Sequence, residues 1–197
     1  MKKILLIPAL SLALFMAACH SSETSSTKTD SSASISADTA TMVHTDTTAV
    51  MNNDNNNADF LTEAAGGGMM EVQLGQLAKT HASSQAVKDF GSMMVRDHSN
   101  ANTQLKSIAT KKNVTLPATL PEKLQKHVDD LTAKNGAEFD KDYISMMVDD
   151  HEKDIKLFEK CAKNDKEDAD VKGFAAKTLP TLYKHLDAAK AIKDKMK

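Results

Sequence analysis

Three histidines and one glutamate fall on apolar stretches of this sequence, where a polar side chain needs a partner once it is buried. The four residues are Glu71, His98, His151 and His185. Imidazole nitrogens and carboxylate oxygens are ligands that zinc, copper and iron accept in proteins. Two thioethers are also available, because Met94 and Met147 precede two of the histidines by one helical turn. These six side chains are therefore candidate ligands for a transition-metal ion.

The same polar residues could instead satisfy one another inside a protein core. An unpaired buried polar group costs about 1–3 kcal/mol, so three buried histidines must find partners of some kind. In one interpretation they form a hydrogen-bonded network with Glu71; in the other, some of them bind copper, zinc or iron. Asp97 and Asp150 each directly precede a histidine and serve as outer acceptors in either case. On the sequence alone, we rank the network ahead of the metal site.

A short repeat places two of the histidines in the same local context. Residues 88–98 and 141–151 are identical at eight of eleven positions, and a ninth position exchanges Phe for Tyr. Both segments end in Asp-His, and both show the apolar spacing of a helix. On parallel helices, His98 and His151 would lie at the same depth and face each other.

Apolar spacing predicts the helices that must position these residues. Four long amphipathic helices and one short helix are expected, at about 59–81, 84–111, 124–131 (short), 137–162 and 168–196. The glycine run at 66–68 predicts either a bend in the first helix or a close neighbour against its bare backbone. Pro180 predicts a kink or a restart in the last helix.

Composition agrees with an all-α protein and narrows the classes of function. The chain has 197 residues, 4% aromatics, seven Gly and four Pro, and it is rich in Ala, Leu, Met and Lys, which favour helices. A net charge of −2 gives no reason to expect a nucleic-acid partner. We find no nucleophile–base set, phosphate-binding loop or Cys-x-x-Cys motif. A non-enzymatic role is therefore favoured, with an enzyme at the histidine site as a further alternative.

Several short motifs are spread over all the predicted long helices. They include Ala64-Ala65-Gly66-Gly67, Leu74-Gly75-Gln76-Leu77-Ala78, Asp97-His98, Met147-Val148 and Leu179-Pro180. With these motifs the chain resembles the bacterial "domain of unknown function 4142" family, which belongs to the ferritin-like superfamily. The resemblance implies a ferritin-like four-helix bundle, in which a long crossover with a short helix joins two helix pairs. The family has no established activity, so the resemblance implies a fold rather than a function.

The sequence departs from the di-iron ferritins at their metal ligands. Those proteins carry Glu-x-x-His on two helices. Here the positions three residues before the histidines are occupied by Val95, Val148 and Leu182. The carboxylate-rich di-iron site is therefore not expected.

Residues 1–18 have the features of an export signal. Lys2 and Lys3 precede an apolar run that is too short to span a membrane as a helix. Met16-Ala17-Ala18-Cys19 then resembles a bacterial lipobox. The resemblance implies that Cys19 is the acylated first residue of a mature lipoprotein, with the membrane as its partner. We expect this lipoprotein in the cell envelope, on the outer membrane facing the periplasm; no protein partner is identified.

Residues 19–57 are predicted to be a disordered tether behind this lipidated cysteine. The 38 residues after Cys19 include eight Ser, eight Thr, five Asn and four Asp, too few of them apolar to offset the entropy of ordering. The helical domain is then expected to span residues 58–197. The remaining cysteine, Cys161, lies on an apolar helix face and is expected to be buried without a disulfide.

Overall fold

The computed structural model describes the backbone of residues 47–196 and the side chains of residues 55–196. Cys19 and the predicted signal at residues 1–18 lie outside this part. The described chain forms five helices: α1 (Thr47–His81), α2 (Gln85–Lys111), α3 (Glu122–Thr132), α4 (Gly136–Lys163) and α5 (Ala169–Lys195). This arrangement confirms the predicted all-α class and the order of four long helices and one short helix.

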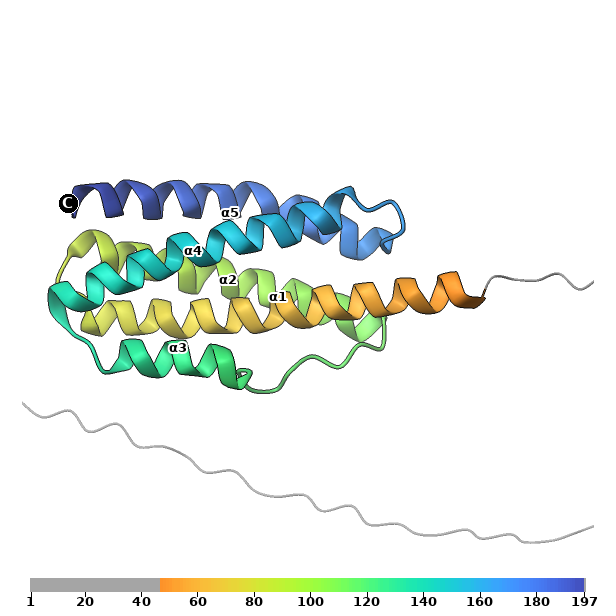
Figure 1. Cartoon of the computed structure of the whole chain (residues 1–197), viewed down its shortest axis with the longest axis horizontal. Coiled ribbons are helices and arrows are strands. Elements are labelled where there is room, and N and C mark those ends of the chain that lie inside the picture. Colours follow the sequence, from red (N-terminus) through yellow and green to blue (C-terminus); the bar gives the residue numbers. More distant parts are fainter. Residues whose placement is uncertain (1–46, 197) are drawn as a thin grey trace, which may run out of the picture. The chain divides into compact units, whose positions relative to one another are not determined.

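The four long helices form two neighbouring pairs (Figure 1). Helix α1 packs along α2, and α4 packs along α5, while α2 contacts α5 and α1 contacts α4 across the bundle. The crossover between α2 and α4 carries α3, which lies against the outer side of α1. The bundle topology is thus the one predicted. None of the described helices is both long and apolar enough to cross a membrane.

The first helix starts earlier than predicted. Helix α1 begins at Thr47 rather than near residue 59, so the last part of the segment predicted as a disordered tether is helical. Asn57 is only 6% exposed, and its Oδ1 accepts a hydrogen bond from the backbone N–H of Asp168 at 3.2 Å. Extending a helix that already exists adds one hydrogen bond per residue without a new nucleation cost. Composition alone therefore placed the domain boundary too late.

Close neighbours, one of the two outcomes predicted there, accompany the glycine run in α1. A Cβ on Gly66 would lie 3.2 Å from Leu124 Cδ1 of α3, and one on Gly68 would overlap the side chain of Asn102 on α2. Helix α1 is continuous through this run. Helix α5 likewise continues across Pro180, so the restart, one of the two outcomes predicted there, does not occur.

The apolar core consists of two clusters that flank the histidines along the helices. On α2, for example, His98 follows Met94 of one cluster and precedes Leu105 of the other. The second cluster contains three phenylalanines with ring centroids 5.0–6.5 Å apart: Phe60, Phe158 and Phe174. Cys161 is 4% exposed in this cluster, and burial raises its thiol pKa to about 12. The prediction that Cys161 is buried and free of a disulfide is confirmed.

Candidate metal centre

Three helices bring His98, His151 and His185 together in the middle of the bundle. The histidines come from α2, α4 and α5 and are 6%, 0% and 0% exposed. Their ring centroids lie 5.2–5.7 Å apart, and one ring nitrogen of each lies within 4.8 Å of those of the other two. The prediction that His98 and His151 face each other is therefore confirmed. Three buried histidines at this spacing could hold a metal ion.

Glu71 of α1 contributes a buried carboxylate beside two of these rings. It is 1% exposed, and its Oε2 lies 2.8 Å from Nδ1 of His98, while its Oε1 lies 3.4 Å from Nδ1 of His151. Within the described residues, neither oxygen is in a well-aligned hydrogen bond. Burial raises the pKa of Glu71 to about 7, because the charged form loses its hydration. A nearby cation would favour the ionised form.

In His151 and in His185, one ring nitrogen lies next to an oxygen atom that can accept a hydrogen bond but cannot donate one. Nδ1 of His151 lies 2.9 Å from the carbonyl oxygen of Met147. Nε2 of His185 lies 3.0 Å from Oδ2 of Asp97. The Arg96 guanidinium hydrogen-bonds the same carboxylate, which lowers the pKa of Asp97 to about 2 and keeps it ionised. Each of these two ring nitrogens must therefore carry the hydrogen.

This assignment leaves two lone pairs directed at each other. In a neutral imidazole only one nitrogen carries hydrogen, so Nε2 of His151 and Nδ1 of His185 are both unprotonated, and they lie 3.2 Å apart. Reversing either tautomer only moves the acceptor–acceptor contact to Met147 O or to Asp97 Oδ2. The arrangement is satisfied when a cation lies between the two nitrogens. Two nitrogens that bind one tetrahedral ion at 2.0–2.1 Å are about 3.3 Å apart, close to the spacing observed.

A proton is a poor candidate for that cation at neutral pH. Burial is the largest cause of the shift at all three histidines, and it lowers the pKa of His98, His151 and His185 to about 4. The third ring has a free nitrogen as well, since Nε2 of His98 is buried without a hydrogen-bond partner among the described groups. Three ring nitrogens thus lack a hydrogen-bond donor at pH 7.

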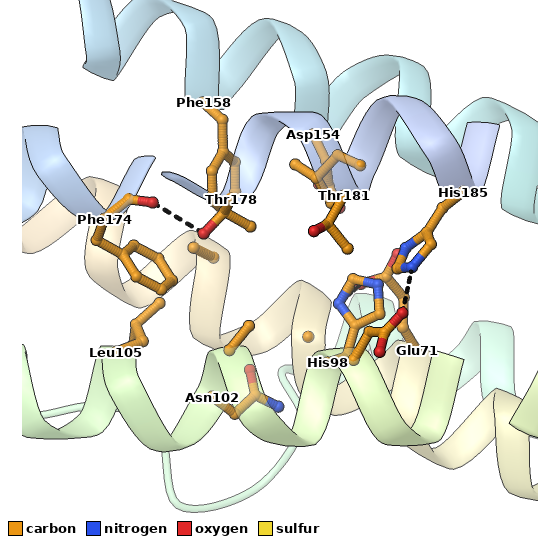
Figure 2. Close-up of a pocket in the computed structure, with 15 residues that line it drawn as sticks. Glu71, His98, Asn102, Leu105, Asp154, Phe158, Phe174, Thr178, Thr181 and His185 are labelled. Carbon is orange, nitrogen blue, oxygen red and sulfur yellow. Dashed lines mark hydrogen bonds and ion pairs between the residues drawn. The ribbon is translucent and has the colours of Figure 1, made fainter. Parts of the chain in front are cut away.

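A small cavity adjoins the histidines (Figure 2). It has a volume of about 30 Å³, enough for one or two water molecules. His98, His185 and Glu71 line one end, and Leu105, Phe158 and Phe174 line the other. Asn102, Asp154 and Thr181 provide polar wall groups.

Of the other residues predicted from the sequence, one forms a hydrogen bond with the histidine cluster through its side chain and three do not. Asp97 contacts His185, as described above, whereas Asp150 has one oxygen 3.5 Å from Lys153 Nζ and a second that is buried with no hydrogen-bond partner in the described chain. Met94 and Met147 are fully buried in an apolar cluster, and Met147 meets His151 through its backbone carbonyl. The structure thus brings together Glu71, the three histidines and Asp97.

Asp154 is the wall residue that sequence reasoning missed. It lies three residues after His151 on α4 and lines the cavity. Burial and the nearby carboxylates of Glu71 and Asp150 raise its pKa. The sequence does contain a signal for Asp154, because residues three apart lie on the same face of a helix and Asp154 follows His151 by three. The Glu-x-x-His pattern of the di-iron proteins concerns only the positions before each histidine, and Asp154 follows one.

Comparison with known proteins agrees with the fold. The crystal structure of a DUF305 fragment from Deinococcus radiodurans superposes with a TM-score of 0.63, covering 71% of this chain and 96% of that chain at 7% sequence identity. At so low an identity the likeness concerns the fold alone. None of the curated proteins matches this chain.

A protein-family model matches the chain and agrees with the family resemblance that the sequence motifs indicate. The model described as "Domain of unknown function (DUF4142)" matches residues 28–192. The match includes Glu71, the three histidines and every long helix of the bundle. It therefore covers well over half of the sequence, and the chain belongs to the DUF4142 family.

Proposed function

We propose that this bundle binds one divalent transition-metal ion through His98, His151 and His185. The observation that carries the proposal is the 3.2 Å contact between Nε2 of His151 and Nδ1 of His185, each left without hydrogen by its outer partner. A carboxylate or carbonyl behind each ligating histidine is the usual outer arrangement of a protein metal site. Glu71 has this role for His98, since it lies at Nδ1 of that ring.

Ligand chemistry narrows the choice of ion. Imidazole suits Zn²⁺, Cu²⁺ and Fe²⁺, whereas monovalent copper prefers thiolates and thioethers. Both predicted thioether ligands, Met94 and Met147, belong to the apolar cluster next to the site. We therefore favour a divalent ion over monovalent copper, and we choose Zn²⁺ and Cu²⁺ for the test. A polar network without metal remains the competing explanation for the same residues.

Metal binding is tested by equilibrium dialysis of the tag-free protein against Zn²⁺ and Cu²⁺. We expect one ion per chain and a rise in melting temperature of about 5–10 °C at a hundredfold excess over Kd. His151→Ala should weaken binding more than about 100-fold, because it removes a direct ligand rather than an outer partner. His127→Ala is the matched control, since His127 is a half-buried histidine of α3 outside the cluster.

Two results would contradict the proposal. One is equal metal affinity of the wild type and the His151→Ala variant, which would place the ion elsewhere. The other is no metal binding by the wild type while His151→Ala still destabilises the fold, which would identify a polar network.

We also propose that the bundle is carried on the cell envelope by a lipid at Cys19. The support is the export-signal pattern of residues 1–18 and the Ala17-Ala18-Cys19 sequence. Several acyl chains give durable membrane attachment, unlike one chain. Cys19→Ala should release the protein from membranes or leave it unprocessed, as fractionation and mass spectrometry would show. Membrane retention of a correctly cleaved Cys19→Ala protein would refute the anchor.

A further inference from the structure

The cavity beside the histidines suggests what a bound metal would do with its remaining coordination position. His98 and His185 reach its wall, so two of the three proposed ligands border a space that holds one or two water molecules. The His98 side chain is buried, with only 6% of its surface exposed, and its Nε2 has no hydrogen-bond partner among the described residues. One of the residues that line this space thus carries a ring nitrogen without a hydrogen-bond partner.

Polar groups from three further helix positions line the same space. Figure 2 shows Asp154 and Thr181 on the side of the cavity across from the helix that carries His98 and Asn102. Asn102 can lie against α1 because residue 68 is glycine, where any Cβ would overlap the Asn102 amide. A carboxyl, a hydroxyl and an amide thus surround a volume that apolar side chains could have filled.

The number of histidines indicates whether the protein alone would fill all the coordination positions of the metal ion. Structural zinc sites use four protein ligands, whereas sites that bind an exogenous ligand use three and keep one position for water or a small molecule. Here three imidazoles converge, and the carboxylate of Glu71 is directed at Nδ1 of His98 and of His151. Glu71 is engaged by these two contacts, and the cavity that it lines together with His98 and His185 offers space for a fourth ligand.

We propose that the metal centre is an open site, which binds a small anion such as hydroxide or azide on the side of the cavity. The inference rests on the proposed metal function and adds to it the class of exogenous ligand. Thr181 is placed to donate a hydrogen bond to that ligand, and Asp154 and Asn102 complete its polar surroundings. Burial and the carboxylates of Glu71 and Asp150 raise the pKa of Asp154. The cavity limits the ligand to about the size of two waters.

The test titrates sodium azide into the full chain loaded with Cu²⁺ and follows the visible and electron paramagnetic resonance spectra. We expect a saturable change with one azide per copper. Thr181→Val keeps the side-chain volume and removes the hydroxyl, so azide affinity should fall about tenfold while copper content is unchanged. Ala101→Val adds two carbons to the cavity wall and should abolish azide binding. Ala188→Val is the matched control on a half-buried α5 position outside the cavity.

The outcomes separate this inference from the function on which it rests. Copper binding without any azide response would identify a closed site, with Glu71 as the fourth ligand, and would overturn the inference alone. Equal azide affinity in the wild type, Thr181→Val and Ala101→Val would place the anion outside the cavity and overturn it too. Failure to bind copper would overturn both proposals. Circular dichroism and copper content establish that each variant is folded. If Ala101→Val does not fold, the azide affinity of the isosteric Thr181→Val variant tests the inference by itself.

Discussion

The two copies of the repeat, at residues 88–98 on α2 and 141–151 on α4, have nearly the same sequence but different surroundings. Their final histidines behave alike: His98 and His151 are both buried, their rings are 5.7 Å apart, and both contact Glu71. The residues just before them do not. Asp97 binds His185 of α5, whereas Asp150 makes no hydrogen bond to a histidine within the described chain. The histidines share one role, and the aspartates do not.

A neighbouring sequence difference accompanies the different behaviour of the aspartates. Asp97 follows Arg96, whose guanidinium binds it at 2.7 Å and lowers its pKa to about 2. Asp150 follows Asp149 in the second copy, and its pKa is raised, mainly by burial and in small part by that neighbouring charge. A permanently ionised acceptor is therefore available to His185 from one copy only.

A second difference between the copies sets how closely the helices approach. Gly91 of the first copy contacts α1 so closely that a Cβ there would lie 2.6 Å from Ala78 Cβ and 2.7 Å from the Gly75 carbonyl oxygen. The equivalent residue of the second copy is Ile144, which is fully buried in the core. The α1–α2 contact is thus backbone against backbone, whereas α4 fills its interface with a side chain.

The largest effect on stability is expected at this glycine. Gly91→Ala must push α1 and α2 apart, and overpacking of this kind costs about 1–3 kcal/mol. The matched control is Gly173→Ala on α5, where a Cβ meets nothing within 4 Å, so alanine should stabilise by up to about 1 kcal/mol through helix propensity. Urea denaturation measures both. If Gly91→Ala were as harmless as Gly173→Ala, the close contact between α1 and α2 would be wrong.

The two aspartates provide the next comparison, in metal affinity. Asp97→Asn removes the acceptor that fixes the tautomer of His185, and the loss of such an outer partner costs about 10–100-fold in affinity. Asp150→Asn is the matched change in the other copy, and we expect it to alter affinity by less than about threefold because Asp150 holds no ligating ring. Competition with a zinc chelator measures both values. Equal losses in the two variants would show that the copies have equivalent roles after all.

The third comparison concerns a pH dependence that the two repeat histidines should share. An unfolded histidine has a pKa of about 6.5, and burial lowers it to about 4 for His98 and His151. The unfolded chain thus binds protons first, so stability present above pH 6.5 is lost as the pH falls toward 4. The slope is at most about 1.4 kcal/mol per pH unit for each histidine.

Urea midpoints of the metal-free protein between about pH 7 and pH 4.5 measure this loss. His185 adds to it, since its pKa is also about 4, whereas Glu71, with a pKa raised to about 7, opposes it between about pH 4.5 and 7. His98→Gln and His151→Gln should each flatten the profile by the same amount. A profile that both variants leave unchanged would mean that neither ring is buried in its neutral form.

The order of helices was predictable because helix periodicity is a local property of the chain. The ends of α2 and α4 fell within one or two residues of the predicted ones, since turn and capping residues mark them. The start of α1 was not predictable in the same way. Its Asn-rich first turns have a poor helix-forming composition, and Asn57 is ordered by a contact with Asp168 that lies 111 residues away in the sequence.

In the candidate site, too, some features follow from the sequence and others only from the tertiary structure. The apolar stripes and the repeat determined from the sequence alone that Glu71, His98, His151 and His185 point into the bundle, because a residue's face on a helix follows from its spacing. Only the tertiary structure decided which nitrogen meets which acceptor, that the thioethers lie in the core, and that Asp154 borders a cavity. Those features depend on the rotation of four helices about their axes and on the distances between them. Such quantities arise from side-chain packing across the bundle, and spacing within one helix does not contain them.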